Sequence, residues 1–170
     1  MPREILNIDR LPENTCFGCG HHNPGGLRTK IWRADGDPQR IDGEWTPDEN
    51  HCGFPGLVHG GLLYTVMDCV AAWTVNMLRT EKGAFWILRS ASVKYHSPVR
   101  HGDRVLLSGT IEDGGEPWAP VLIRTECRRE DGSLFVDGSY KMNPLTPDRL
   151  KGILGMDEIP ANWRGFIAGP

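Results

Sequence analysis

The 170-residue sequence predicts an α+β fold, in which a curved antiparallel sheet of about five to six strands wraps around one long central helix. Two observations predict it. The segment from Leu62 to Leu78 is apolar on almost every helical face, so it must be buried. Strand-like segments joined by short turns flank it on both sides, which favours antiparallel pairing. A sheet can bury a single helix of this kind only by curling around it.

The elements follow from local patterns in chain order. Residues 27–33 and 41–45 alternate apolar and polar side chains around the turn 35–38, which predicts a hairpin. A loop over 46–58 leads into the helix. Four strands are then expected over 84–99, 104–111, 118–129 and 134–142, in a meander with Gly- and Asp-containing turns.

The chain divides into a main domain and two flanking parts. Residues 1–26, rich in Gly and Pro, predict a short helix or extended arm followed by a loop. The domain itself is expected over 27–142. Residues 143–170 form a C-terminal extension without sustained periodicity, in which 149–156 is a candidate short helix.

Composition narrows the class of protein. The net charge of −3 arises from mixed signs without a basic run, so nothing points to a nucleic-acid partner. Residues 1–10 lack the apolar core of a secretion signal, and no apolar run reaches the 18 or more residues of a membrane span. We therefore expect a cytoplasmic protein that does not bind membranes. Five cysteines, an odd number, then indicate free thiols.

The helix carries two features that suggest chemistry. Gly60 and Gly61 follow His59 at its start, where free backbone N–H groups and the helix dipole favour an oxyanion. Asp68 is the one ionisable residue within the apolar segment, and no cation lies three or four residues away. A buried carboxylate without a partner is costly, so such a residue is usually kept for chemistry or for a hydrogen bond.

The spacing of these features predicts a dimer. Nine residues separate His59 from Asp68, which is about 13 Å along a helix axis. On one helix the two groups are too far apart to act on the same atom. A second copy must therefore supply the missing half of a shared site, so we expect a homodimer or a dimer of dimers.

Three stretches carry a family resemblance. The His-Gly-Gly start with its acid nine positions later resembles the hotdog-fold acyl-CoA thioesterases, in particular the phenylacetyl-CoA thioesterase-like group of the 4-hydroxybenzoyl-CoA thioesterase superfamily. Residues 16–20 with Asn23-Pro24 and Gly26-Leu27 resemble the N-terminal signature of one branch. Residues 93–99 with Gly102-Asp103 resemble the strand and turn after the helix. The resemblance covers roughly residues 14 to 142.

This resemblance implies hydrolysis of an acyl-CoA. The N–H of Gly60, with Gly61 as a second donor, would form an oxyanion hole. Asp68 would act as general base or as nucleophile. In the family the acid of one protomer faces the helix start of the other, and some members carry Ser or Thr where this chain has Ala72. His59 is either a catalytic group or a capping residue. The mechanism requires neither a metal nor an organic cofactor.

Other residues are candidates for binding the substrate. Asn50 and His51 are expected to project from the loop toward the helix start, where they could position water. Tyr64 is a candidate pocket residue, as are four others that suit the core equally well, namely Met67, Trp73, Phe85 and Trp86. Lys94, like Arg89 and Arg100, could contact the nucleotide end of coenzyme A.

A Cys-x-x-C loop offers a further interpretation. Cys16 and Cys19, with His21 and His22, form half of a common zinc ligand set. Only His51 and Cys52, far along the chain, could complete it. We therefore expect no metal and a tight loop with two free thiols.

Two other functions stay open at this point. A hotdog enoyl-CoA hydratase would use an Asp and a His in a differently placed loop, which the His-Gly-Gly helix argues against. In a non-catalytic acyl-CoA-binding protein, Asp68 would only hydrogen-bond a backbone group across a dimer interface.

Overall fold

The computed structural model describes residues 3–79, 81 and 83–163. Short helix α1 (Leu6–Asp9) precedes strands β1 (Lys30–Arg33) and β2 (Arg40–Trp45). The connection to long helix α2 (Gly60–Leu78) contains η1 (Glu49–His51), β3 (Cys52–Phe54) and β4 (Leu57–Val58). Strands β5 (Phe85–Tyr95), β6 (Val105–Asp113), β7 (Val121–Arg128) and β8 (Leu134–Leu145) follow, and α3 (Pro147–Leu154) and η2 (Ala161–Trp163) end the described chain.

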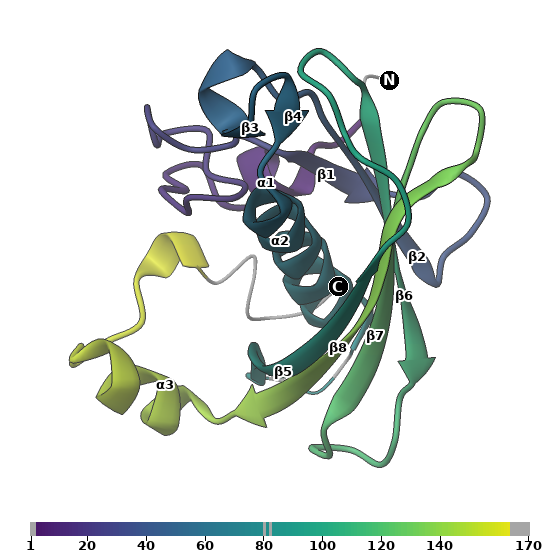
Figure 1. Ribbon diagram of the computed structural model, residues 1–170. Coiled ribbons are helices and arrows are strands. Elements are labelled where there is room, and N and C mark those ends of the chain that lie inside the picture. The colour runs from purple at the N-terminus through teal and green to yellow at the C-terminus, as the bar shows by residue number, and fades with distance from the viewer. Residues whose placement is uncertain (1–2, 80, 82, 164–170) are drawn as a thin grey trace.

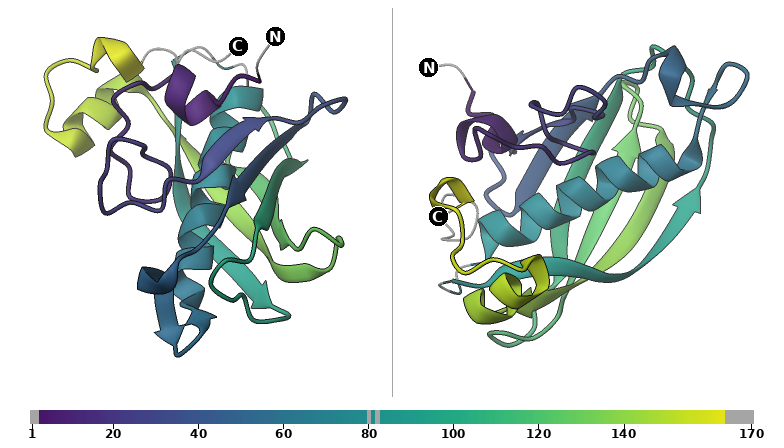
Figure 2. Two further views of the ribbon diagram at one scale, coloured as in Figure 1. Left: turned by 90° about the horizontal axis from the view of Figure 1, so that it is seen from above. Right: turned by 90° about the vertical axis from the view of Figure 1, so that its left-hand side faces the viewer.

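Six strands form one antiparallel sheet in the order β1-β2-β6-β7-β8-β5. The sheet is strongly curved, and α2 runs across its concave face (Figures 1 and 2). This confirms the hotdog arrangement of one helix inside a curved antiparallel sheet. The four predicted strands after the helix and the two before it are all present, with ends shifted by a few residues.

One feature of the predicted topology is wrong. We expected the last four strands to pair in sequence as a meander, and only β6, β7 and β8 do so. Strand β5 instead pairs with β8 at the far edge, and β6 pairs with β2. Pairing over this distance depends on how the whole sheet closes around α2, which local turn patterns do not encode.

Helix α2 is held closely against the sheet. Its inner side chains join one hydrophobic core with residues from every strand of the six-stranded sheet; examples are Val66, Val70, Ile31, Ile41, Trp86, Leu107, Ile123 and Tyr140. Gly109 on β6 allows the close approach, since a Cβ atom there would lie 2.2 Å from Thr74 Oγ1 and 2.9 Å from Val70 Cγ1. Contrary to the expectation from the sequence, α2 is long and apolar enough to cross a membrane. However, 61% of the relevant window is buried inside the fold, as in a core helix.

Both flanking parts pack on this body. Asn7 of α1 is 1% exposed and donates through Nδ2 to the carbonyls of Cys19 and Thr29, while its Oδ1 accepts from the Ile31 N–H. Leu150 of α3 is buried in the common core. Trp163 stacks on Phe85 with ring centroids 6.3 Å apart. The predicted boundaries after residue 26 and after residue 142 thus lie between parts of the chain that share one core. Residues 1, 2 and 164–170 lie outside the described residues.

Candidate functional site

The start of α2 is built by hydrogen bonds to His59. Its Nδ1 accepts from the Gly61 N–H at 2.9 Å, which makes His59 the N-cap of the helix. Its own N–H donates to the His51 carbonyl at 2.9 Å, and its carbonyl accepts from the Leu62 N–H at 3.0 Å. Of the two roles considered for His59, these contacts are those of a capping residue.

These bonds leave one free donor at the helix start. The Gly61 N–H is occupied by His59, so the expectation that Gly61 adds a second oxyanion donor does not fit the geometry. The Gly60 N–H has no acceptor among the described residues, and it lies at the positive end of the helix dipole. Gly60 is therefore the position at which this turn can polarise a carbonyl oxygen.

Tyr95 fixes this glycine from the sheet. Its hydroxyl donates to the Gly60 carbonyl at 2.9 Å, and its ring lies 3.3 Å from where a Cβ of residue 60 would be. We did not anticipate this contact, because Tyr95 lies at the end of the edge strand β5, 35 residues farther along the chain. The sequence carries no signal for it beyond the match of residues 93–99 to the family pattern.

His51 braces the loop before α2. Asp48 and His51 cap η1 reciprocally: the Asp48 N–H donates to His51 Nδ1 at 2.9 Å, and Asp48 Oδ1 accepts from the Asn50 N–H at 2.8 Å. The His51 ring packs edge-on against Trp45, with centroids 5.3 Å apart. Its side chain is only 17% exposed. Its contacts hold the loop before α2 in place. The Asn50 side chain, by contrast, is exposed.

Asp68 lies two and a half turns along α2, on the half-buried face of the helix. Burial, and then the nearby Cys16 thiol, raise its pKa to about 6. No hydrogen bond within the described chain offsets this. At neutral pH the carboxylate is still largely ionised but more basic than usual, which suits proton abstraction.

A pocket of about 380 Å³ opens beside Asp68. Its walls are side chains of α2, of the start of β5 and of the two flanking parts, including Cys16, Cys19, Ala72, Trp73, Phe85 and Trp163. Of the five aromatic or apolar side chains left ambiguous by the sequence, Trp73 and Phe85 line this pocket, whereas Met67 and Trp86 are buried in the core. A volume of this size suits a small ligand.

The remaining predicted binding residues lie elsewhere. Tyr64 is half-buried on α2, its ring 5.5 Å from that of Tyr140. Lys94 is exposed on β5, opposite Asp137 of β8 in the strand register. Neither lines the pocket beside Asp68.

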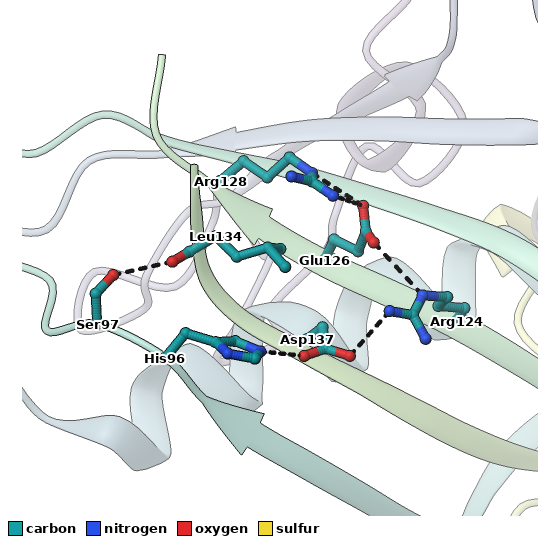
Figure 3. Close-up of polar contacts among 7 residues, drawn as sticks. All are labelled: His96, Ser97, Arg124, Glu126, Arg128, Leu134 and Asp137. Atoms are coloured by element: carbon teal, nitrogen blue, oxygen red, sulfur yellow. Dashed lines mark hydrogen bonds and ion pairs between the residues drawn. The ribbon is translucent and has the colours of Figure 1, made fainter. Parts of the chain in front are cut away.

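The outer face of the sheet carries paired charges. Arg124 bridges Glu126 and Asp137, Arg128 also pairs with Glu126, and His96 bonds Asp137 from the end of β5 (Figure 3). The His96 hydrogen bond, followed by the charge of Arg124, lowers the pKa of Asp137. A depression of about 410 Å³ on this face is lined in part by these paired groups, among them Arg124, Glu126 and Arg128.

The Cys-x-x-C loop lies against α2, next to Asp68. The thiol sulfurs of Cys16, Cys19 and Cys69 all lie within 4.8 Å of one another, and those of Cys16 and Cys69 are 3.7 Å apart. Hydrogen bonding from the other two thiols lowers the pKa of Cys16. The expected third ligands, His51 and Cys52, are not part of this cluster. The sequence interpretation missed Cys69, since a cysteine within an apolar helix is indistinguishable from a small core residue.

Comparisons with known proteins find similarity to thioesterases. Residues 55–116 match the model of the Thioesterase superfamily. Mouse acyl-coenzyme A thioesterase 13 is 27% identical over 111 residues, which cover 65% of this chain and 77% of the relative.

Solved structures give the same fold. The Escherichia coli PaaI protein from the phenylacetic acid degradation operon superposes with a TM-score of 0.61 at 15% identity, covering 70% of this chain and 80% of that one. A hypothetical thioesterase from Streptococcus pneumoniae, solved with coenzyme A, gives a TM-score of 0.60 at 16% identity, covering 69% and 89%.

Proposed function

We propose that this chain is a hotdog-fold member of the thioesterase superfamily and that it hydrolyses the thioester bond of an acyl-CoA to a free acid and coenzyme A. The observation that carries the proposal is the pair formed by a free N–H at Gly60 and an uncompensated carboxylate at Asp68, both on α2.

The two groups have complementary roles in this reaction. The Gly60 N–H donates to the thioester carbonyl oxygen as negative charge develops on it. Asp68 takes a proton from water as the water oxygen bonds to the carbonyl carbon. The tetrahedral intermediate then collapses, the C–S bond breaks, and the coenzyme A thiolate leaves and is protonated. In the nucleophilic alternative, the carboxylate itself attacks and water hydrolyses the mixed anhydride.

The separation of the groups supports a site shared between two copies. Eight residues along a helix correspond to about 12 Å, so Gly60 and Asp68 of one chain cannot reach the same carbonyl. The surfaces that we propose for pairing are the half-buried face of α2 that carries Asp68 and the edge strand β5, which pairs only with β8 in the described sheet. We propose a homodimer, in which Gly60 of one copy faces Asp68 of the other.

The remaining predicted residues take supporting roles in this proposal. His59 caps the helix and so aims the Gly60 N–H, and His51 holds the loop before it. The exposed Asn50 amide is the candidate for holding the attacking water, given that Ala72 offers no hydroxyl. Lys94 is proposed to contact the phosphates of coenzyme A and Tyr64 the acyl chain. The cytoplasmic location stays a prediction.

A panel of acyl-CoA substrates tests the activity. We expect thiol release, followed with a chromogenic disulfide, for at least one aryl- or alkyl-acyl-CoA, at a rate proportional to enzyme concentration. Hydration of an enoyl-CoA without thiol release would instead identify a hydratase. Thermal protection by acyl-CoA without turnover of any substrate would identify a binding protein. Either outcome overturns the proposal.

A further inference from the structure

The three-cysteine cluster has the dimensions of a metal site. In tetrahedral zinc coordination, sulfur atoms 2.3 Å from the ion lie about 3.8 Å from one another. The Cys16 and Cys69 sulfurs are 3.7 Å apart, and Cys19 lies within 4.8 Å of both. A disulfide would need the two sulfurs at about 2.0 Å. The reduced cluster therefore matches the spacing of metal ligands better than that of a bonded pair.

The loop is shaped to deliver its two thiols to α2. Gly18, between them, lies so close to the helix that a Cβ atom would be 2.4 Å from Cys69 Sγ and 3.2 Å from Thr65 Cγ2. The turn is closed by the Gly20 N–H, which donates to the Cys16 carbonyl at 2.8 Å. Any larger residue at position 18 would push the loop, and both its thiols, away from Cys69.

Surrounding donors hold the thiols in place. The Asn14 side chain accepts from the Cys16 N–H at 2.9 Å, and its Nδ2 lies 3.5 Å from Cys19 Sγ. Trp73 Nε1 lies 3.5 Å from the same sulfur, and Asn7 bonds the Cys19 carbonyl at 2.7 Å. Asn7 and Asn14 are 1% and 5% exposed. N–H groups directed at sulfur stabilise a thiolate ligand and orient it, which is the usual role of residues around a metal centre.

We propose that Cys16, Cys19 and Cys69 bind a thiophilic divalent cation, Zn²⁺, and so fasten the N-terminal loop to α2 beside Asp68. Three protein ligands leave a fourth position, which opens into the pocket shared with Asp68 and is filled by water or a small ligand. This revises the expectation that the loop holds no metal, which rested on the apparent lack of a nearby third ligand. The proposal does not depend on the thioesterase activity.

Metal content and cobalt substitution test the site in the full-length protein. Protein purified under reducing conditions without chelator is expected to contain about one zinc per chain by elemental analysis. After the zinc is removed, one equivalent of Co²⁺ should produce the visible absorption bands of tetrahedral cobalt and the near-ultraviolet bands of thiolate ligation. Stoichiometric cobalt uptake by the reduced apoprotein supports the proposal even if zinc is lost on purification.

Variants assign the ligands. Cys69→Ser and Cys16→Ser should each lose the tetrahedral cobalt spectrum, with circular dichroism checking that the fold is retained. Cys52→Ser is the matched control: this thiol is exposed and outside the cluster, so its loss should leave metal binding unchanged. Reduced wild-type protein that takes up neither zinc nor cobalt overturns the proposal. So does equal loss of metal in the Cys52 and Cys69 variants, which would indicate adventitious binding.

Discussion

His59 Nδ1 accepts the backbone N–H of Gly61 at 2.9 Å, and this bond determines which N–H at the start of α2 stays free. It occupies the second helical donor and leaves the first, on Gly60, without an acceptor among the described residues. In the proposed reaction the histidine acts through the helix, as a positioning residue.

Removing this cap should destabilise the protein. Replacing an N-cap acceptor with alanine typically costs about 1 kcal/mol, so we expect His59→Ala to lower the free energy of unfolding by about that amount. His59→Asn keeps an acceptor at the cap and should recover most of the loss and most of the hydrolysis rate. Urea unfolding of the two variants at equal protein concentration measures this. Equal damage by both substitutions, in stability and in rate, would rule out capping as the role of His59.

Proline at position 60 tests the oxyanion donor. It removes the N–H but suits the first position of a helix, and the extended backbone of His59 (φ −65°, ψ 126°) is compatible with a following proline. We expect Gly60→Pro to lower kcat by about 10²- to 10³-fold. Gly60→Ala is the matched control, since its Cβ makes the same contact with the Tyr95 ring but keeps the N–H. A similar loss in both variants would trace the effect to packing.

A mixed dimer tests the shared site. Gly60→Pro and Asp68→Asn homodimers should both be nearly inactive, because each lacks one half of both sites. A heterodimer has one site with both groups intact. Random mixing after dissociation should therefore restore about a quarter of the wild-type rate. Two inactive parents that stay inactive when mass spectrometry shows heterodimers would contradict a site shared between the two copies.

The paired charges around Asp137 on the outer face of the sheet predict that stability depends on pH. The pKa of Asp137 is lowered in the folded protein, chiefly by the His96 hydrogen bond, so the unfolded state takes up its proton first on acidification. Its contribution is present above the unfolded pKa of about 3.9 and is lost as the pH falls through the folded pKa. We expect Asp137→Asn to lower the free energy of unfolding by less than about 1 kcal/mol at pH 7. This difference in unfolding free energy from the wild type should shrink below about pH 4.

The control for this measurement is Glu112→Gln on β6. Glu112 is exposed and has no ion-pair partner in the described part of the chain, so its replacement should leave the pH profile unchanged. If the wild type's excess in unfolding free energy over Asp137→Asn grew on acidification, the assigned direction of the pKa shift would be contradicted.

Local patterns in the sequence were sufficient to predict the strands and the central helix. The apolar segment beginning at Leu62 ends at Leu78 as predicted, because its burial on nearly all faces follows directly from composition. The edge position of β5 was not predictable in this way. It depends on closure of the sheet, in which β6 pairs with β2 and leaves β8 as the partner of β5.

The site was only partly predictable for a related reason. Gly60 and Asp68 could be found because they depart from the chemistry of their neighbours: a bare backbone at a helix start and a charge within an apolar run. Cys69 and Tyr95 could not, because each resembles an ordinary core or strand residue. Their roles arise from contacts with residues 53 and 35 positions away, which exist only in the folded chain.

The hydrolysis rate of Asp68→Asn tests the central claim most directly. The amide keeps the size of the side chain but can neither take a proton from water nor attack a carbonyl. With the best acyl-CoA of the panel, followed by thiol release, we expect kcat to fall by about 10²- to 10⁴-fold while assembly and substrate binding persist. An Asp68→Asn protein that assembles, binds acyl-CoA and hydrolyses it within a few-fold of the wild-type rate would contradict the claim that Asp68 is the catalytic carboxylate.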